Sequence, residues 1–335
     1  MSEFGTPDWA AKRETVYGHS YIMSQDKFRA SICALSATIL AGFPLPLLAQ
    51  TPGTMGVRSL PPLANPDDPS TPAKALFGRK LTPAKMRPQA IGFYSRGCIA
   101  GAVPVEHDGP AWQVMRPSRN RNWGHPELVK VVKRIAQLGQ QQGHWPGLLV
   151  GDMSQPRGGP MLTGHTSHQI GLDADIWFTP MPDHKQTRRE REFKSAVNMV
   201  GRDKRDIDTS VWTQGHMNIV RIAAKQPEVQ RILVNAAIKK ALCRYRGSDR
   251  TWLSKVRPYW GHNYHFHLRI YCPKGSPSCR RQAFVPGSDG CGKALAWWFT
   301  DRVLNPPPPR KPPKKRPPVT MAQMPGACMT VLNAR

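Results

Sequence analysis

The chain has 335 residues, 39% of them hydrophobic, and its 48 Lys or Arg against 22 Asp or Glu give a formal net charge of +26 at pH 7. A chain of this length can bury a substantial core, and it shows no internal repeat, which excludes the repeat architectures. A basic excess this large attracts polyanions, of which nucleic acid is the usual one, but the sequence offers no recognised nucleic-acid-binding motif.

The first 49 residues predict export. Lys27 and Arg29 precede an apolar stretch over residues 30–43, and the small residue Ala49 stands before the expected cleavage site. This arrangement is typical of a secretory signal peptide. The stretch is only modestly hydrophobic and ends near Gly and Pro, so we expect no permanent transmembrane segment. Residues 1–22 are interpreted as an upstream extension.

Export changes the interpretation of the charge. Residues 1–49 carry four basic and four acidic side chains, so the exported part keeps the whole excess. In the periplasm the polyanion within reach is the cell envelope, with its peptidoglycan stem-peptide carboxylates, acidic polymers and lipid headgroups. We therefore expect the envelope, and no specific nucleic acid, as the partner. The oligomeric state stays open.

One helix and one strand are predicted before residue 160. Residues 61–83 are rich in Pro and predict an extended lead-in. Pro126 opens a helix over residues 126–138, whose apolar positions 128, 131, 132, 135 and 138 share one face. Residues 147–152 predict a short strand.

Two short stretches hold five of the 11 histidines. Residues 164–175 contain His165, His168 and Asp175, and residues 261–268 contain His262, His265 and His267. Three nitrogen or oxygen ligands with one position left open are what a catalytic zinc ion needs. A lone His pair on a strand is more often an ordinary hydrogen-bonded feature, so the two stretches must converge for the zinc hypothesis to hold.

The second stretch predicts a strand, because residues 265–271 alternate polar and apolar side chains. Phe266, Leu268 and Ile270 would face the core, while His265 and His267 project from the opposite face. In the first stretch Gly171 permits a tight turn, and residues 173–178 predict another strand. Neutral imidazole ligands also need a carboxylate or carbonyl for the second ring N–H, and Asp152 or Asp173 could accept it.

Asp203 and Asp206 form a further acidic pair, and their spacing would place both carboxylates on one face of a helix. Such a segment is more often a solvated loop or helix surface, and two carboxylates without a histidine suit zinc poorly. A second metal site is therefore the weaker of the two interpretations.

The C-terminal part combines a predicted helix with a proline-rich strap. Residues 227–244 have Val229, Ile232, Leu233, Ala236 and Ala237 on one side of a helix. Residues 306–318 lack apolar side chains and predict an extended polyproline segment. The expected fold is α+β, with a small central antiparallel sheet that carries the site, surrounded by helices and long loops.

Cysteine usage agrees with export. Cys33 leaves with the signal peptide, and the other six suggest disulfides in an oxidising compartment. Six cysteines allow fifteen pairings, so their spacing alone selects none. Some of them could also be free thiols.

Other hydrolytic signatures are absent from the sequence. It has no HExxH and no GxSxG, and its only SxxK begins at Ser24, inside the predicted signal peptide. A β-lactam would therefore find no catalytic serine of that type to acylate.

Ser167, His168, Gly171 and Asp175, followed by the His265/His267 pair, resemble the signature of zinc peptidases grouped around lysostaphin and the D-Ala-D-Ala metallopeptidases. The stretches GDMSQPRGG, GHTSHQIGLDADIW and WGHNYHFHLR are most similar to the penicillin-insensitive murein endopeptidase family, and the similarity extends from about Leu76 to the C-terminus.

The resemblance implies a zinc-dependent hydrolase of D-alanyl to meso-diaminopimelyl cross-links in peptidoglycan. His168, Asp175 and His267 would bind Zn²⁺, with His165 as a further ligand or a close neighbour. His265 would act as general base or transition-state stabiliser, and His262 would be another active-site histidine. A second zinc ion at Asp203 and Asp206 is an additional possibility.

The resemblance also implies an organisation for the chain. Residues 50–75 would be the lead-in, 76–304 the catalytic domain, and 305–335 the strap and C-terminal segment. The implied disulfide pairs are Cys98 with Cys328, Cys243 with Cys291, and Cys272 with Cys279.

Arg157, in the Gly-rich segment before the first histidine stretch, is a candidate for binding a stem-peptide carboxylate through its guanidinium fork. A plain Gly-rich loop is the alternative. For the whole protein, the alternative to an enzyme is a basic, non-catalytic envelope-binding protein with a structural metal, which a closed site of His165, His168, Asp175 and His267 would favour.

Overall fold

The structure is a computed structural model that describes residues 51–57, 59–283, 288–308 and 317–335. The predicted signal peptide and the centre of the proline-rich strap lie outside these residues. The described residues belong to one compact unit. None of its described helices is long and apolar enough to cross a membrane.

The central sheet is larger than the sequence indicated and is mixed instead of antiparallel. Its strands lie side by side in the order β10 (Val256–Pro258), β9 (Val229–Val234), β11 (His265–Ile270), β8 (Asp173–Trp177), β7 (Leu148–Val150), β5 (Trp112–Val114) and β4 (Asp108–Gly109). The β10/β9 and β5/β7 pairs are parallel, and the other neighbours are antiparallel. The outer strands have only two or three residues, which is too short for a recognisable alternation.

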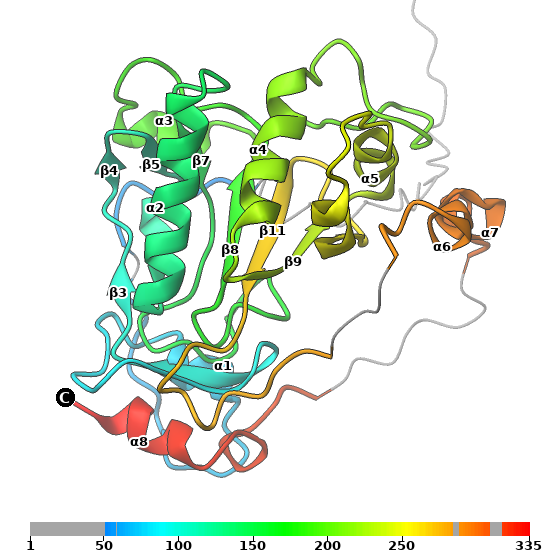
Figure 1. Ribbon diagram of the computed structural model, residues 1–335. Coiled ribbons are helices and arrows are strands. Elements are labelled where there is room, and N and C mark those ends of the chain that lie inside the picture. Colours follow the sequence, from blue (N-terminus) through cyan, green and yellow to red (C-terminus); the bar gives the residue numbers. More distant parts are fainter. Residues whose placement is uncertain (1–50, 58, 284–287, 309–316) are drawn as a thin grey trace, which may run out of the picture. The chain divides into compact units, whose positions relative to one another are not determined.

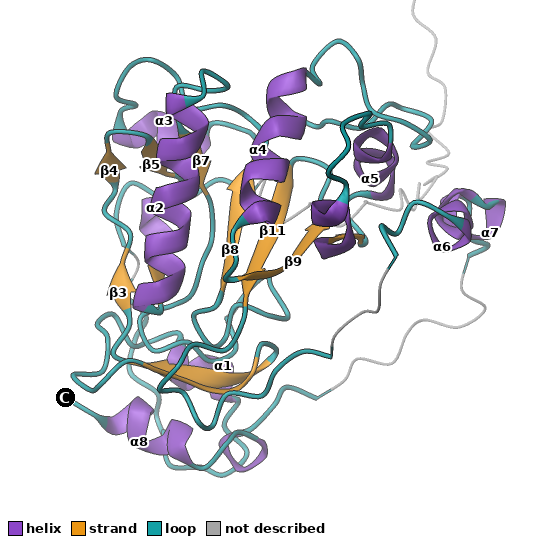
Figure 2. Ribbon diagram, in the orientation of Figure 1, coloured by secondary structure: helices purple, strands orange, loops and turns teal. Residues whose placement is uncertain are grey.

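Two small sheets and several helices complete the α+β fold, as Figure 2 shows by colour. The small sheets pair β1 (Gln89–Phe93) with β2 (Arg96–Ala100), and β3 (Val103–Pro104) with β6 (Trp123–Gly124). The helices are α1 (Ala73–Phe77), α2 (Pro126–Gln141), α3 (Arg188–Phe193), α4 (Gln214–Lys225), α5 (Ala236–Cys243), α6 (Lys293–Ala296), α7 (Asp301–Leu304) and α8 (Ala327–Asn333). Single 3₁₀ turns are η2 (Pro117–Arg119), η3 (Thr251–Lys255), η4 (Trp297–Phe299) and η5 (Met321–Gln323).

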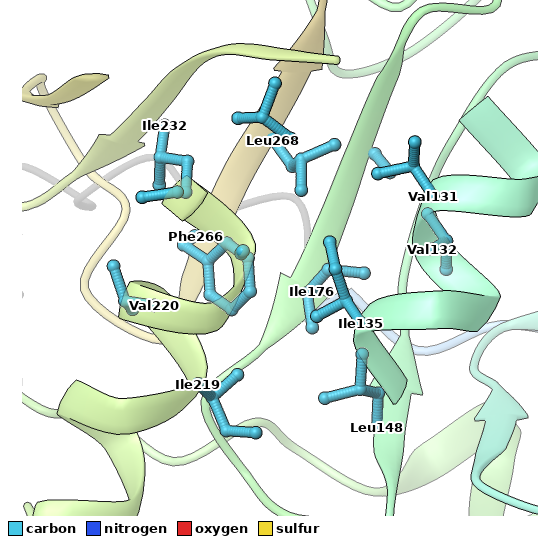
Figure 3. Close-up of a cluster of buried hydrophobic side chains, with 14 of the residues drawn as sticks. Val131, Val132, Ile135, Leu148, Ile176, Ile219, Val220, Ile232, Phe266 and Leu268 are labelled. Carbon is cyan, nitrogen blue, oxygen red and sulfur yellow. The ribbon is translucent and has the colours of Figure 1, made fainter. Parts of the chain in front are cut away.

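Helices α2 and α4 cover one face of the central strands (Figure 1). Helix α2 confirms the sequence prediction: Pro126 is its first residue, and the His125 side chain accepts a hydrogen bond from the backbone N–H of Glu127. Figure 3 shows the side chains of both helices packed on Phe266, Leu268 and Ile176 of the sheet. Because this face is apolar and covered, the polar residues of β8 and β11 lie on the other face.

The prediction of a single helix over residues 227–244 is wrong. Val229–Val234 form β9, between β10 and β11, and only Ala236–Cys243 are helical. The Asn235 side chain caps α5 by accepting a hydrogen bond from the backbone N–H of Ala237. A short apolar run fits a buried strand as well as a helix face, and here its two neighbouring strands decide the outcome.

The three disulfides implied by the family resemblance are present: Cys98–Cys328, Cys243–Cys291 and Cys272–Cys279. Cys98–Cys328 joins β2 to α8 across a sequence separation of 230 residues. In the chain-entropy model a closed loop of that size stabilises the folded state by about 5 kcal/mol. The C-terminal segment is therefore tied to the rest of the fold.

Candidate metal centre

Two paired strands bring the histidines and aspartates of the two predicted stretches together. Strands β8 and β11 are antiparallel, and His267 lies directly opposite Asp175. Cross-strand partners project from the same face of a sheet, and so do residues two positions away. Asp173, Asp175, His265 and His267 therefore share the face that α2 and α4 leave free. All four are buried.

The loop before β8 adds His165 and His168 to this face. His168 has a left-handed backbone with φ of 67°, and Gly171 follows with φ of 68°. A Cβ atom at Gly171 would lie 2.3 Å from the side chain of Ile99, so only Gly fits this turn. The backbone N–H of His168 donates to Asp173 Oδ2 over 3.0 Å. The turn and this hydrogen bond direct the His168 ring at β8.

Four imidazole rings surround the carboxylate of Asp175. One nitrogen of each ring lies 3.1–3.5 Å from a carboxylate oxygen: His165 Nδ1 at 3.5 Å, His168 Nε2 at 3.3 Å, His265 Nε2 at 3.5 Å and His267 Nδ1 at 3.1 Å. Two ligands of a tetrahedral zinc ion, each about 2.0–2.1 Å from the metal, are separated by about 3.3 Å. Each of these separations is therefore compatible with an imidazole nitrogen and an Asp175 oxygen bound to the same ion, which can take at most four ligands in all.

Unpaired buried atoms at the same place also fit a metal. Within the described structure, both ring nitrogens of His168, Nδ1 of His265 and Oδ2 of Asp175 are buried and have no hydrogen-bond partner. Leaving such groups unsatisfied costs free energy, which coordination to a cation would remove. His165, His168 and Asp175 each offer a ligand atom within 4.8 Å of the other two. The His267 ring lies 4.7 Å from that of His168.

A second layer of charged side chains holds the rings in place, as the sequence suggested for Asp152 and Asp173. His165 Nε2 lies 3.0 Å from Asp152 Oδ2, which also pairs with Arg119 and Arg121. His267 Nε2 lies 3.3 Å from Asp173 Oδ1. In each case the far ring nitrogen faces a carboxylate, so the near nitrogen points at Asp175. Such outer partners fix the orientation of metal-binding imidazoles.

The pKa values of the clustered side chains are shifted in different directions. Burial lowers the pKa of His265 to about 4, although the Asp175 carboxylate opposes the shift. Burial also acts to lower the pKa of His267, but Asp173 and Asp175 outweigh it and raise that pKa to about 9. Burial alone would raise the pKa of Asp175, yet His265 and His168 hold it well below its usual range. The Asp175 carboxylate is therefore charged at neutral pH, and His265 is a neutral imidazole.

The cluster opens to a cavity of about 370 Å³. His165, His262 and His267 are part of its wall, together with the turn of the β1–β2 hairpin and residues of β9. His168 and Asp175 lie beneath this wall and are almost fully buried. His165, His262 and His267 are therefore the histidines that a molecule in the cavity would meet.

His262 lies at the edge of the cluster. Its ring centre is 4.9 Å from that of His265 and 5.9 Å from that of His267. The His262 backbone is left-handed, with φ of 54°. Its ring is fixed by Nδ1, which lies 2.7 Å from the backbone oxygen of Trp260. Burial, followed by the neighbouring His265 and His267, lowers the pKa of His262 to about 3.

Arg157 does not have the predicted place at the rim of a substrate groove. Its side chain is buried, and its guanidinium donates to the backbone oxygens of Thr82, Val331, Leu332 and Ala334. These acceptors include the last carbonyls of α8, which otherwise lack partners. Arg157 anchors the C-terminal helix, and the sequence could not show this because the contact spans the length of the domain.

The acidic pair Asp203 and Asp206 is also not arranged as expected. The segment is a turn with Lys204 at φ of 60°, and no helix aligns the two carboxylates. Asp206 binds Arg244 through both of its oxygens and Lys240 through one. The interpretation as a solvated charged surface fits these contacts, and the second metal site gains no support.

Several cavity residues were missed in the sequence. They are Phe93, Tyr94, Ser95, Arg231, Leu233, Tyr259 and Gln282. Had residues 229–234 been recognised as a strand, the alternation would have placed Arg231 and Leu233 on the same face as the histidines. The apolar residues of this segment were instead interpreted as one face of a helix.

Comparison with known proteins gives a consistent result. Residues 90–333 match the family model described as penicillin-insensitive murein endopeptidase. The chain is 42% identical over 244 residues to the penicillin-insensitive murein endopeptidase of Haemophilus influenzae, covering 73% of this chain and 82% of that protein. It is 41% identical over 217 residues to that of Yersinia enterocolitica (65% and 78%) and 40% identical over 247 residues to that of Klebsiella pneumoniae (73% and 86%). The matched region contains the whole histidine cluster and all three disulfides, and the chain belongs to the penicillin-insensitive murein endopeptidase family.

Proposed function

We propose that the protein is a zinc-dependent peptidoglycan endopeptidase of the periplasm, exported by its N-terminal signal peptide, which hydrolyses D-alanyl to meso-diaminopimelyl cross-links. The observation that carries the proposal is the ring of four imidazole nitrogens within 3.5 Å of the Asp175 carboxylate at the base of an open cavity. The names of the relatives supply the substrate class.

His168, Asp175 and His267 would hold the ion, and His165 would be either a fourth ligand or a close neighbour. Nitrogen and oxygen ligands of this kind suit Zn²⁺. When bound there, zinc would supply a Lewis acid for the scissile carbonyl and a water acidic enough to lose its proton near neutral pH.

The chain's own residues would position the reactants and move the proton. His265 Nε2, the nitrogen that faces Asp175, would take the proton from the nucleophilic water and return it to the leaving amine. His262, whose ring centre lies 4.9 Å from that of His265, would support the charge that develops in the transition state. Arg119, Arg121 and Asp152 would hold the ring of His165 at the cavity wall.

The alternative of a structural metal requires that protein ligands enclose the ion. His165 and His267 line the cavity, and the His165 side chain keeps 15% of its surface exposed. A ligand set that borders a cavity leaves room for water or substrate, which is the property of catalytic sites. The enzyme interpretation is therefore favoured.

The test is incubation of the purified protein with cross-linked muropeptide dimers, followed by mass analysis of the products. We expect monomers with zinc and none after chelation, with activity restored by added zinc. His265→Ala should abolish cleavage while the zinc content stays at that of the wild type. His184→Ala, which changes an exposed histidine outside the cluster, is the matched control. Cleavage that persists in His265→Ala, or that is indifferent to chelation, would contradict the proposal.

A further inference from the structure

The wall of the site cavity contains basic side chains and no acidic ones among its described residues. Its described lining residues include two arginines, Arg231 and Arg269, and no Asp or Glu. The carboxylates of Asp173 and Asp175 lie beneath the wall, where the histidines and Arg269 surround them. An anionic group entering the cavity would therefore meet cations without meeting a competing carboxylate.

Arg269 is already neutralised within the fold. Its Nε and one terminal nitrogen donate to the two oxygens of Asp173 over 2.7 and 3.0 Å, and the other terminal nitrogen donates to Gln282. The guanidinium also stacks over the Tyr94 ring, 3.9 Å from its centre. Such a buried, two-pronged pair holds β11 to β8 and leaves little capacity for a ligand.

Arg231 differs from Arg269 in each of these respects. It lies on β9 directly opposite Arg269, and its side chain is only half-buried. In the described part of the chain its printed hydrogen bond is to the backbone oxygen of Ala283, and it forms no ion pair with a carboxylate. Burial, and next the charge of Arg269, lower the pKa of its guanidinium. An anion bound to Arg231 would oppose both effects.

The strand register relates Arg231 to the histidines. Leu233 is the partner of His267 on β9, and Arg231 lies two residues further along the same face. Two residues of a strand span about 7 Å, which an arginine side chain and a short ligand group can bridge. The guanidinium therefore borders the same cavity as the candidate metal ligands.

We infer that Arg231 binds a substrate carboxylate on the amine side of the scissile bond. The inference rests on the proposed function: in a D-alanyl to meso-diaminopimelyl cross-link, the carbon bonded to the scissile nitrogen carries a free carboxylate. A guanidinium fork binds a carboxylate through two parallel hydrogen bonds and so orients the amide as well as attracting it. Arg231 then selects cross-links whose leaving residue bears a negative charge.

Two synthetic cross-linked peptide dimers test this inference, identical except that the carbon bonded to the scissile nitrogen bears a carboxylate in one and a primary carboxamide in the other. We expect the wild type to favour the carboxylate dimer by roughly 10- to 100-fold in kcat/KM, the range for a hydrogen bond to a charged group. Arg231→Met should lose that preference through the carboxylate dimer alone and cleave the carboxamide dimer like the wild type. Arg231→Lys should recover part of the preference.

Arg257→Met is the matched control, because Arg257 on β10 donates to the backbone oxygen of Ser288 and does not line the site cavity. Zinc content and thermal unfolding are measured for every variant. Equal loss on both dimers in Arg231→Met would mean a structural role and would overturn the inference. A wild type that cleaves both dimers equally would overturn it while leaving the proposed function intact, and a wild type that cleaves neither would remove both.

Discussion

Two closely spaced pairs of aspartates, Asp173 with Asp175 and Asp203 with Asp206, have opposite environments in the structure. Asp173 and Asp175 are buried on β8, where four imidazole nitrogens face Asp175 and the side chains of Arg269 and His267 face Asp173. Asp203 and Asp206 lie on a surface turn, where Asp206 is neutralised by Arg244 and Lys240. Both segments offered carboxylates in the sequence, so carboxylate spacing does not distinguish a site from a solvated surface.

The two pairs differ in the groups that solvate or neutralise their carboxylates. Water and mobile Lys or Arg side chains satisfy an exposed carboxylate at little cost. A buried carboxylate has no water, so it must have fixed partners, and the partners of Asp175 are imidazoles that themselves have unpaired nitrogens. The buried pair therefore fits a bound cation better than the exposed pair does.

The largest effect is expected for Asp175→Asn. Asn replaces the carboxylate that four imidazole nitrogens face by a neutral amide. Zinc affinity should fall by at least about 100-fold, beyond the loss caused by outer partners, and cleavage of muropeptide dimers should become undetectable. Equilibrium dialysis with metal analysis measures the affinity. Wild-type zinc content in this variant would refute the assignment of the centre.

Asp173→Asn should mainly affect stability. It leaves the Arg269 guanidinium buried without its charged partner, and breaking a buried pair of this kind costs about 3–5 kcal/mol. His267 also loses the carboxylate beside its Nε2, so zinc affinity should fall by about 10- to 100-fold while turnover at saturating zinc persists. Urea unfolding and zinc titration measure the two effects. Asp203→Asn, at an exposed position, should change neither.

Arg157→Met should lower stability by about 2 kcal/mol and leave kcat/KM on muropeptide dimers unchanged. The buried guanidinium donates to four backbone oxygens that the variant would leave without those hydrogen bonds. Exposed Arg246→Met is the matched control. A selective rise in KM for Arg157→Met, with unchanged unfolding, would return Arg157 to the substrate groove.

The sequence predicted the candidate site better than it predicted the sheet around it. Alternation in residues 265–271 and a glycine turn before residue 173 are local signals, and they relate His265 to His267 and His168 to Asp175 without knowledge of the rest of the fold. His165 and His262 became candidates through the family resemblance. The roles of β4, β5 and β10 depend on their neighbours, because two or three residues contain no alternation. The size and mixed direction of the sheet therefore could not be inferred.

The errors share one physical cause, which is contact between residues far apart in the chain. Residues 229–234 form a strand because β10 and β11 supply partners on both sides. Arg157 is structural because it meets carbonyls of the C-terminal helix. Neither partner can be found from the local pattern, and the misassigned strand also concealed Arg231.

The smallest effect is expected for Asp206→Asn. Arg244 and the backbone N–H of Ile207 hold the pKa of Asp206 below its usual value, although partial burial acts in the opposite direction. A depressed pKa in the folded state contributes stability above the unfolded pKa and loses it as the pH falls through the folded one. Because 38% of the side chain is exposed, solvent screening limits this contribution to less than about 1 kcal/mol. Urea unfolding should show a small deficit for the variant at pH 7 that begins to shrink below about pH 4 and is lost as the pH falls through the lower, folded pKa, with zinc stoichiometry equal to that of the wild type throughout. Loss of one zinc equivalent in Asp206→Asn would show that the surface pair binds metal after all, and that burial is not what distinguishes the two aspartate pairs.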